Sequence, residues 1–163
     1  MPQTVIPLRL PFLEAIEYWK KKVVLANSVY TQLEKEVKKR AFSVAGINNL
    51  DELQLVYNAI HEATAKGLTF IDFKDQIADV IEAHGWTYPN DWRVKNIYRT
   101  NIQMNYNAGR YKQMNEENDT RPYRMYIAVN DENSRPNHVA LDGKIFRYDD
   151  PIWDYFKPLN GFG

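Results

Sequence analysis

The chain has 163 residues, about the length of one domain, and its 21 Lys and Arg balance its 21 Asp and Glu at a formal net charge of zero. This balance argues against wholesale electrostatic binding to nucleic acid, which needs an excess of basic side chains. No apolar run approaches the roughly 20 residues that cross a bilayer. The absence of Cys excludes disulfides, thiol nucleophiles and thiolate metal sites in this sequence.

The first eleven residues contain Pro2, Pro7 and Pro11. Each proline lacks an N–H and disfavours helix in the residue before it, so residues 1–11 are predicted to form an extended arm. The amino terminus also lacks a basic segment that leads into a long apolar stretch. We therefore expect a soluble chain that has no membrane partner and does not follow the general secretory route.

Apolar residues at three- and four-residue spacing predict four amphipathic helices after the arm. Their predicted ranges are 12–24, 29–46, 50–66 and 70–83. Asn49 with Glu52, and Thr69 with Asp72, have the spacing of a capping box at the starts of the third and fourth helices. The fourth helix is expected to stop at His84, where a surface or capping role explains the imidazole.

A longer helix is predicted from a cap near Asn90 or Asp91 to about Met114. Its predicted buried side consists of Val94, Ile97, Met104, Ala108 and Tyr111. Another face carries side chains at spacings of four, three and four residues, namely Arg99, Gln103, Tyr106 and Arg110. Amides also gather in this helix, although asparagine favours caps and turns. Their density indicates packing against polar backbone or against a partner.

After residue 120 the apolar pattern changes to period two. The alternating residues Tyr123, Met125, Ile127 and Val129 predict a strand whose buried face they form. A loop over 130–138 and a turn at residues 141–143 lead to a second predicted strand over 144–148. The carboxy-terminal part of the chain is therefore expected to hold a small antiparallel sheet.

The predicted fold class is α+β, with four to five amino-terminal amphipathic helices followed by the small antiparallel sheet. We expect a single domain. Within it, residues 1–11 are the arm, 12–117 the helical part, and 121–163 the sheet with an aromatic tail.

The densest set of reactive side chains lies around His138, with Asp131, Arg135 and Asp142 close to it in sequence. A histidine and two carboxylates could bind a divalent metal or serve as acid and base. The favoured alternative is structural: Asp131 and Asn133 form turns, Arg135 pairs with a carboxylate, and His138 bonds to backbone and fixes a long loop.

Arg99 and Arg110 also allow two interpretations. On one helical face they could grip a phosphate or carboxylate with paired hydrogen bonds. The favoured alternative is that they clamp the His138 loop onto the helix, which predicts that the long helix and this loop are neighbours.

A basic cluster at the end of the second predicted helix consists of Lys35, Lys38, Lys39 and Arg40. Nucleic-acid contact through this cluster is the functional interpretation. A solvated helix face is the favoured one.

Several segments, in this order, resemble the phage Mu F-like minor head proteins, also called phage head morphogenesis proteins. They are Pro7–Phe12 with Glu14–Ile16 and Trp19, Arg40–Gly46, Tyr98–Asn101, Tyr106–Arg110, Arg135–His138 and Leu141–Lys144. The resemblance covers essentially the whole chain. It implies a minor capsid protein of a phage or prophage, present in the virion, that associates with portal, capsid or scaffold proteins in the bacterial host cytoplasm during head assembly, and that could contact packaged DNA.

The resemblance also marks the family's most recognisable positions, for which it implies no established catalytic role. They are Arg99, Thr100, Asn101, Asn107, Gly109, Arg110, Arg135, His138, Asp142 and Gly143. Relatives often continue past this sequence with a Cys-Arg-Cys-like strand. No cofactor is expected here, but in a longer natural chain His138 could join such thiolates in a zinc site.

Our preferred prediction is therefore a non-enzymatic assembly protein whose arm or aromatic tail docks onto a portal or capsid partner. The alternative is a metal-dependent hydrolase or nuclease, or a toxin-associated module. Its catalytic residues would be Asp131, His138 and Asp142, with Arg99 stabilising negative charge.

Overall fold

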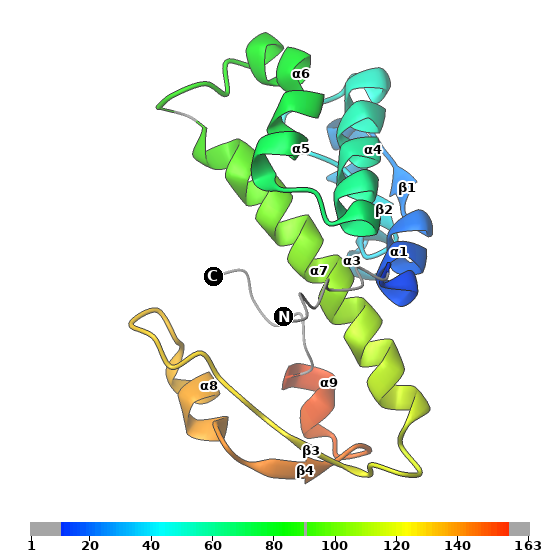
Figure 1. Ribbon diagram of the computed structural model, residues 1–163, viewed down its shortest axis with the longest axis vertical. Coiled ribbons are helices and arrows are strands. Elements are labelled where there is room, and N and C mark those ends of the chain that lie inside the picture. The colour runs from blue at the N-terminus through cyan, green and yellow to red at the C-terminus, as the bar shows by residue number, and fades with distance from the viewer. Residues whose placement is uncertain (1–10, 90, 157–163) are drawn as a thin grey trace, which may run out of the picture. The chain divides into compact units, whose positions relative to one another are not determined.

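The computed structural model describes residues 11–89 and 91–156. The chain separates into two compact units, unit 1 up to Gly109 and unit 2 from Arg110 onward (Figure 1). Residues 1–10 of the predicted arm and the last seven residues lie outside the described residues. The expectation of a single domain stays a prediction, because compactness alone does not define a folding unit.

Unit 1 is mainly helical. Its elements are α1 (Leu13–Lys20), β1 (Val23–Val24), α2 (Asn27–Tyr30), α3 (Lys35–Lys38), β2 (Ala41–Phe42), α4 (Leu50–Lys66), α5 (Phe70–Gln76), α6 (Ala78–Ala83) and most of α7 (Trp92–Glu116). The long helix α7 confirms the prediction of a helix to about Met114, and it continues to Glu116. Of its predicted buried side, Val94 is fully buried and the other four residues are partly buried.

The predicted second helix, 29–46, is wrong. Its residues form the short helices α2 and α3 and the strand β2, which pairs in parallel with β1 and places Val24 opposite Phe42. The predicted first helix is also too long, since α1 ends at Lys20. Phe42 is buried against Trp19 at a ring distance of 5.1 Å. Pairing between distant β-branched and aromatic residues thus outweighs local helical spacing.

The predicted starts of the third and fourth helices are confirmed. At α4 the Asn49 Oδ1 accepts from the backbone N–H of Asp51 at 2.9 Å, and the helix ends at the left-handed Gly67. At α5, Thr69 and Asp72 form both halves of a capping box. The fourth helix is nevertheless divided, because the backbone leaves helical geometry at the buried Ile77 and restarts as α6.

The core of unit 1 is formed by side chains from all of its larger helices. Its buried members are Trp19, Phe42, Val44, Ile47, Leu53, Val56, Ala59, Ile60, Phe73, Ile77, Val80, Ile81, Trp86 and Val94. Trp19 stacks on Tyr57, and its Nε1 donates to the Tyr57 carbonyl at 3.1 Å. Burying a side chain of this size contributes about 1.5–3 kcal/mol.

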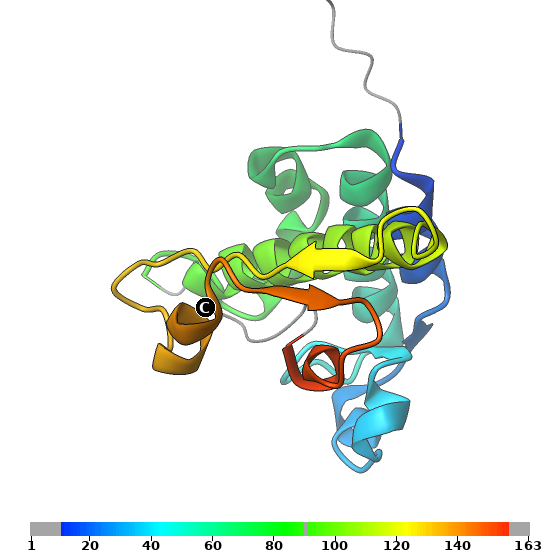
Figure 2. The ribbon, with the colours of Figure 1, turned by 90° about the horizontal axis from the view of Figure 1, so that it is seen from below.

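Unit 2 holds the small antiparallel sheet and confirms the α+β class (Figure 2). After the last turns of α7 its elements are β3 (Tyr123–Met125), α8 (Pro136–Leu141), β4 (Ile145–Arg147) and α9 (Ile152–Phe156). The helices are therefore not all amino-terminal, since α8 and α9 lie in this unit. Among the residues that the structure describes, no helix is long and apolar enough to span a membrane.

The predicted buried face of the first strand is wrong. Tyr123, Met125, Ile127 and Val129 are all exposed, and Ile127 and Val129 reach 77% and 85%. The opposite face is the buried one, where Arg124 is only 6% exposed. The apolar alternation located the strand but not its inward side, because a buried arginine reverses the usual assignment.

Candidate functional site

Gly109, one of the family's recognisable positions, lies where α7 approaches α1 closely. The ring of Phe12 stacks on Tyr106 at 5.7 Å between centroids. A Cβ atom at Gly109 would lie 2.8 Å from the Ala15 backbone nitrogen and 2.8 Å from the Phe12 ring. Glycine is therefore required at position 109 by the packing of two helices within unit 1.

The amides of α7 bond to backbone and to a buried hydroxyl. Asn101 Nδ2 donates to the Ile97 carbonyl at 2.8 Å. Asn105 is completely buried, and its Nδ2 donates to Thr64 Oγ1 at 2.9 Å. Sequence reasoning noted Asn105 among the amides but gave it no role, although its spacing of four from Asn101 and Gly109 places all three on one side of the helix.

Thr100 belongs to the same helical region, and its Oγ1 lies 3.4 Å from Asn96 Oδ1. Asn107 is partly buried. Arg99 and Arg110 are exposed and belong to different units, as do Arg99 and His138. The predicted clamp between the long helix and the His138 loop stays a prediction.

His138 lies on the helix α8, where Pro136 occupies the first turn, and not in an extended loop. Its Nδ1 is hydrogen-bonded to the Tyr126 hydroxyl rather than to backbone. Burial raises the pKa of Tyr126, so the phenol keeps its proton.

Aromatic rings surround this pair and form the small core of unit 2. Phe156 lies 5.6 Å from the His138 ring in an edge-on arrangement. The buried Trp153 contacts Tyr126 and Phe146, and its Nε1 donates to the Arg147 carbonyl at 2.8 Å. The pair thus connects α8 to α9 and to the residue that follows β3, by packing as well as by a hydrogen bond.

Asp142 closes the loop between the two strands. Its Oδ1 accepts from the Ala128 backbone N–H at 2.9 Å, and its Oδ2 accepts from Asn130 Nδ2 at 2.6 Å. These bonds lower the pKa of Asp142. Gly143 follows with φ at +73°, and its N–H donates to the Tyr126 carbonyl at 2.8 Å. A left-handed residue is needed there for the chain to turn into β4.

Asp131 makes a local turn, as the structural interpretation predicted. Its Oδ1 accepts from Ser134 Oγ at 2.8 Å and from the Asn133 backbone N–H at 3.1 Å. Arg135 is exposed and directly precedes α8. Across residues 11–89 and 91–156, no three His, Asp or Glu side chains are grouped so that they could hold a metal ion.

The basic cluster is partly neutralised by its own neighbours. Lys39 Nζ lies 2.8 Å from Glu36 Oε1, and Lys38 Nζ donates to the Thr31 carbonyl at 3.2 Å. Lys35 and Arg40 are exposed.

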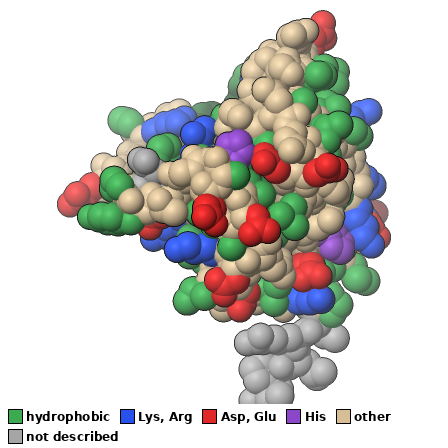
Figure 3. Space-filling view, turned by 90° about the horizontal axis from the view of Figure 1, so that it is seen from above, with side chains coloured by type: hydrophobic (Ala, Val, Ile, Leu, Met, Phe, Trp, Pro, Cys, Tyr) green, Lys and Arg blue, Asp and Glu red, His purple; other side chains and the backbone are tan. Residues whose placement is uncertain are grey.

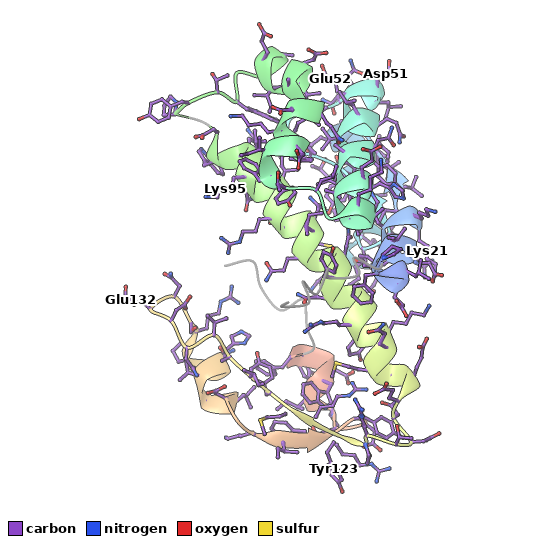
Figure 4. All side chains as sticks on the ribbon, in the orientation of Figure 1. Lys21, Asp51, Glu52, Lys95, Tyr123 and Glu132 are labelled. Carbon is purple, nitrogen blue, oxygen red and sulfur yellow. The ribbon has the colours of Figure 1, made fainter. Side chains whose placement is uncertain are left out.

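Acidic side chains gather on the face of the molecule seen in Figure 3. Figure 4 places Asp51 and Glu52 at the start of α4.

Glu52 makes a contact that its role in a capping pattern does not predict. Its Oε2 lies 2.7 Å from His84 Nε2 across 32 residues of sequence. His84 ends α6, as expected, and its ring lies 5.2 Å from Trp86. The pair therefore links the amino end of α4 to the carboxyl end of α6.

Comparison with known proteins assigns this α+β chain to a class of phage proteins. Residues 28–163 match the family described as Phage Mu protein F like protein. The chain belongs to this family, which confirms the resemblance drawn from its motifs.

Two curated relatives support the assignment. The chain is 32% identical over 183 residues to the "Putative capsid assembly protein F" of Escherichia phage Mu, covering 99% of this chain and 42% of that protein. It is 35% identical over 146 residues to the "Mu-like prophage FluMu F protein" of Haemophilus influenzae (strain ATCC 51907 / DSM 11121 / KW20 / Rd), covering 82% of this chain and 35% of that protein. The chain thus spans less than half the length of either relative. No solved structure matches it.

Proposed function

We propose that this chain is part of a capsid assembly protein of a phage or prophage and that it acts by docking rather than by catalysis. Membership of the Mu F-like family carries the proposal, together with the name of the phage Mu relative. Its place of action is the bacterial host cytoplasm during head assembly, and afterwards the virion.

The hydrogen bonding of the carboxylates supports a role without catalysis. Both oxygens of Asp142 accept hydrogen bonds from its own loop, and Asp131 accepts from Ser134 and Asn133. In unit 2 these carboxylates shape loops, which favours architecture over the hydrolase alternative.

The proposed partners are the portal and the inner capsid or scaffold proteins, and the proposed docking element is the arm, residues 1–11. Phe12 follows the arm directly and stacks on Tyr106 of α7. Docking through the arm would therefore be anchored at its base to the core helices of unit 1.

Co-purification with the portal protein of the same phage or prophage tests this proposal. The wild type should associate with the portal, and a variant lacking residues 2–11 should lose that association while retaining its fold. The truncation ends before Phe12 because that ring packs against α7. Association that survives the truncation would contradict the role of the arm, and no association with any head protein would contradict the docking function.

The basic cluster gives little support to DNA contact. Lys39 is ion-paired with Glu36, and the Lys38 amine is held on a backbone carbonyl. DNA contact through the basic cluster stays a prediction, and it would be marked by an affinity that falls steeply with salt.

A further inference from the structure

Positive charge is concentrated in one part of unit 1, although the whole chain is neutral. Residues 20–40 contain seven basic and two acidic side chains. The fold brings the two ends of this segment together, because β1 and β2 pair in parallel and the Val23 N–H donates to the Arg40 carbonyl at 2.9 Å. Lys22 Nζ donates to the Lys39 carbonyl at 3.0 Å. Basic residues 17 positions apart in the sequence are therefore neighbours.

Three cations of this region lack a counter-charge. Within residues 11–89 and 91–156, no carboxylate pairs with Lys21, Lys22 or Arg40. Lys21 and Arg40 are exposed. The hydrogen bond of Lys22 goes to a neutral carbonyl, and its Nζ lies 4.9 Å from the centre of the Tyr18 ring. These contacts fix the position of the ammonium group without neutralising it.

Lys22 is the cation of this group that an anion would stabilise most. Burial lowers the pKa of its amine to about 8, so the amine is mostly protonated at neutral pH. Its half-buried ammonium has lost part of its hydration and has gained no carboxylate in return. A carboxylate supplied by a partner would attract it more strongly than in bulk water, because the surroundings are less polar.

Exposed valines lie beside these cations. Val23 follows Lys22 directly and is 58% exposed. Val37 is 48% exposed, and its carbonyl accepts from the Arg40 N–H at 3.0 Å. Duplex DNA would leave the valines uncovered, and three cations displace few counterions from it. A protein segment that carries both carboxylates and apolar side chains would match both kinds of residue.

We propose that this surface binds an acidic segment of the portal or capsid partner. Its carboxylates would contact Lys21, Lys22 and Arg40, and its apolar side chains would cover Val23 and Val37. The inference rests on the proposed docking function and gives the chemistry of a second contact, separate from the arm. Two linked contacts strengthen one association, so each is needed for the full affinity.

Calorimetric titration of the whole chain with the portal protein of the same phage or prophage tests this inference. Lys21→Glu combined with Arg40→Glu should weaken binding by about tenfold or more. Lys74→Glu combined with Lys95→Glu is the matched control, because it makes the same charge change at exposed residues of α5 and α7. Figure 4 shows Lys95 and Lys21 on opposite sides of unit 1. The control should bind like the wild type, and circular dichroism checks that both variants are folded.

Carbodiimide coupling tests the chemistry of the contact, since it joins a lysine amine directly to a carboxylate. In the complex, Lys21 or Lys22 should be joined to an Asp or Glu of the portal, and the control lysines should not. Equal affinity of the two double variants, or coupling at the control lysines alone, would overturn the inference and leave the docking function intact. A wild type that does not bind the portal at all would contradict both.

Duplex DNA of about 30 base pairs is the second probe, used at low salt, where phosphate contacts are strongest. The wild type and the Lys21→Glu, Arg40→Glu variant should not differ in their affinity for it. Duplex binding by the wild type that this variant loses would assign the surface to nucleic acid and overturn the inference.

Discussion

The guanidinium of Arg124 donates a hydrogen bond of 3.1 Å to the carbonyl of Met114, and so ties the first strand of the hairpin to the last turns of α7. The same Nη2 atom contacts the side-chain oxygens of Asn115 and Asn118 at 2.8 and 2.6 Å. The carbonyls at the end of a helix have no partner within it, and a cation there complements the helix dipole. Arg124 thus links β3 to the carboxyl end of α7 within unit 2.

Arg124→Ala is expected to destabilise unit 2 by about 2–3 kcal/mol, because it removes the hydrogen bonds that a buried, charged donor makes to Met114, Asn115 and Asn118. Urea denaturation measures this loss, and hydrogen exchange at the Tyr126 amide, which donates to the Lys144 carbonyl at 2.8 Å, locates it in unit 2. Arg121→Ala is the control, since Arg121 is exposed and its ion pair with Glu117 joins two exposed side chains, and it should leave the transition unchanged. Equal effects from both variants would contradict the role assigned to Arg124.

Gly109→Ala is expected to destabilise unit 1 by about 1–3 kcal/mol, because the new methyl would collide with Ala15 and Phe12. The sign is informative, since the same change inside an exposed helix normally stabilises by about 1 kcal/mol. Thermal unfolding compares Gly109→Ala with the wild type. A rise in the melting temperature would mean that α1 and α7 do not approach each other closely at this point.

The pH dependence of stability should contain a contribution from Asp142. Hydrogen bonds lower its pKa below the ordinary value of 3.8 in the folded chain. A carboxyl with a depressed pKa stabilises the fold above the unfolded value, and this stabilisation is lost as pH falls through the folded value.

Asp142→Asn should therefore lie below the wild type in stability at neutral pH and approach it below pH 4. Urea denaturation at a series of pH values tests this convergence. Asp154→Asn, a change at an exposed acidic residue of α9, serves as the comparison. A constant difference between Asp142→Asn and the wild type at every pH would exclude ionisation as its cause.

The sequence predicts those structural features that depend on residues close together along the chain. The starts of α4 and α5 follow from Asn49 and from the Thr69–Asp72 pair, whose bonds reach only two or three residues along the chain. Strand pairing between residues that are far apart in the sequence cannot be predicted in this way. The parallel match of Val24 with Phe42 replaces a helix that the apolar spacing favoured.

In the candidate site, too, local turns could be predicted from the sequence and long-range contacts could not. The turn made by Asp131 and the glycine at 143 follow from local chemistry. The partner of His138 does not, because the Tyr126 hydroxyl is brought to it by the hairpin. The burial of Arg124 beneath an apolar alternation likewise depends on where α7 ends.

Under the proposed function, the chain takes part in head assembly by docking and not by catalysis. The most direct test supplies the gene with Asp131→Asn and His138→Asn together to a phage or prophage that lacks it, and counts the heads formed. Both changes keep hydrogen-bonding partners for Ser134 and Tyr126 but remove the acid and base groups. Heads at the wild-type yield are predicted. A folded, portal-bound double variant that yields no heads would contradict the claim.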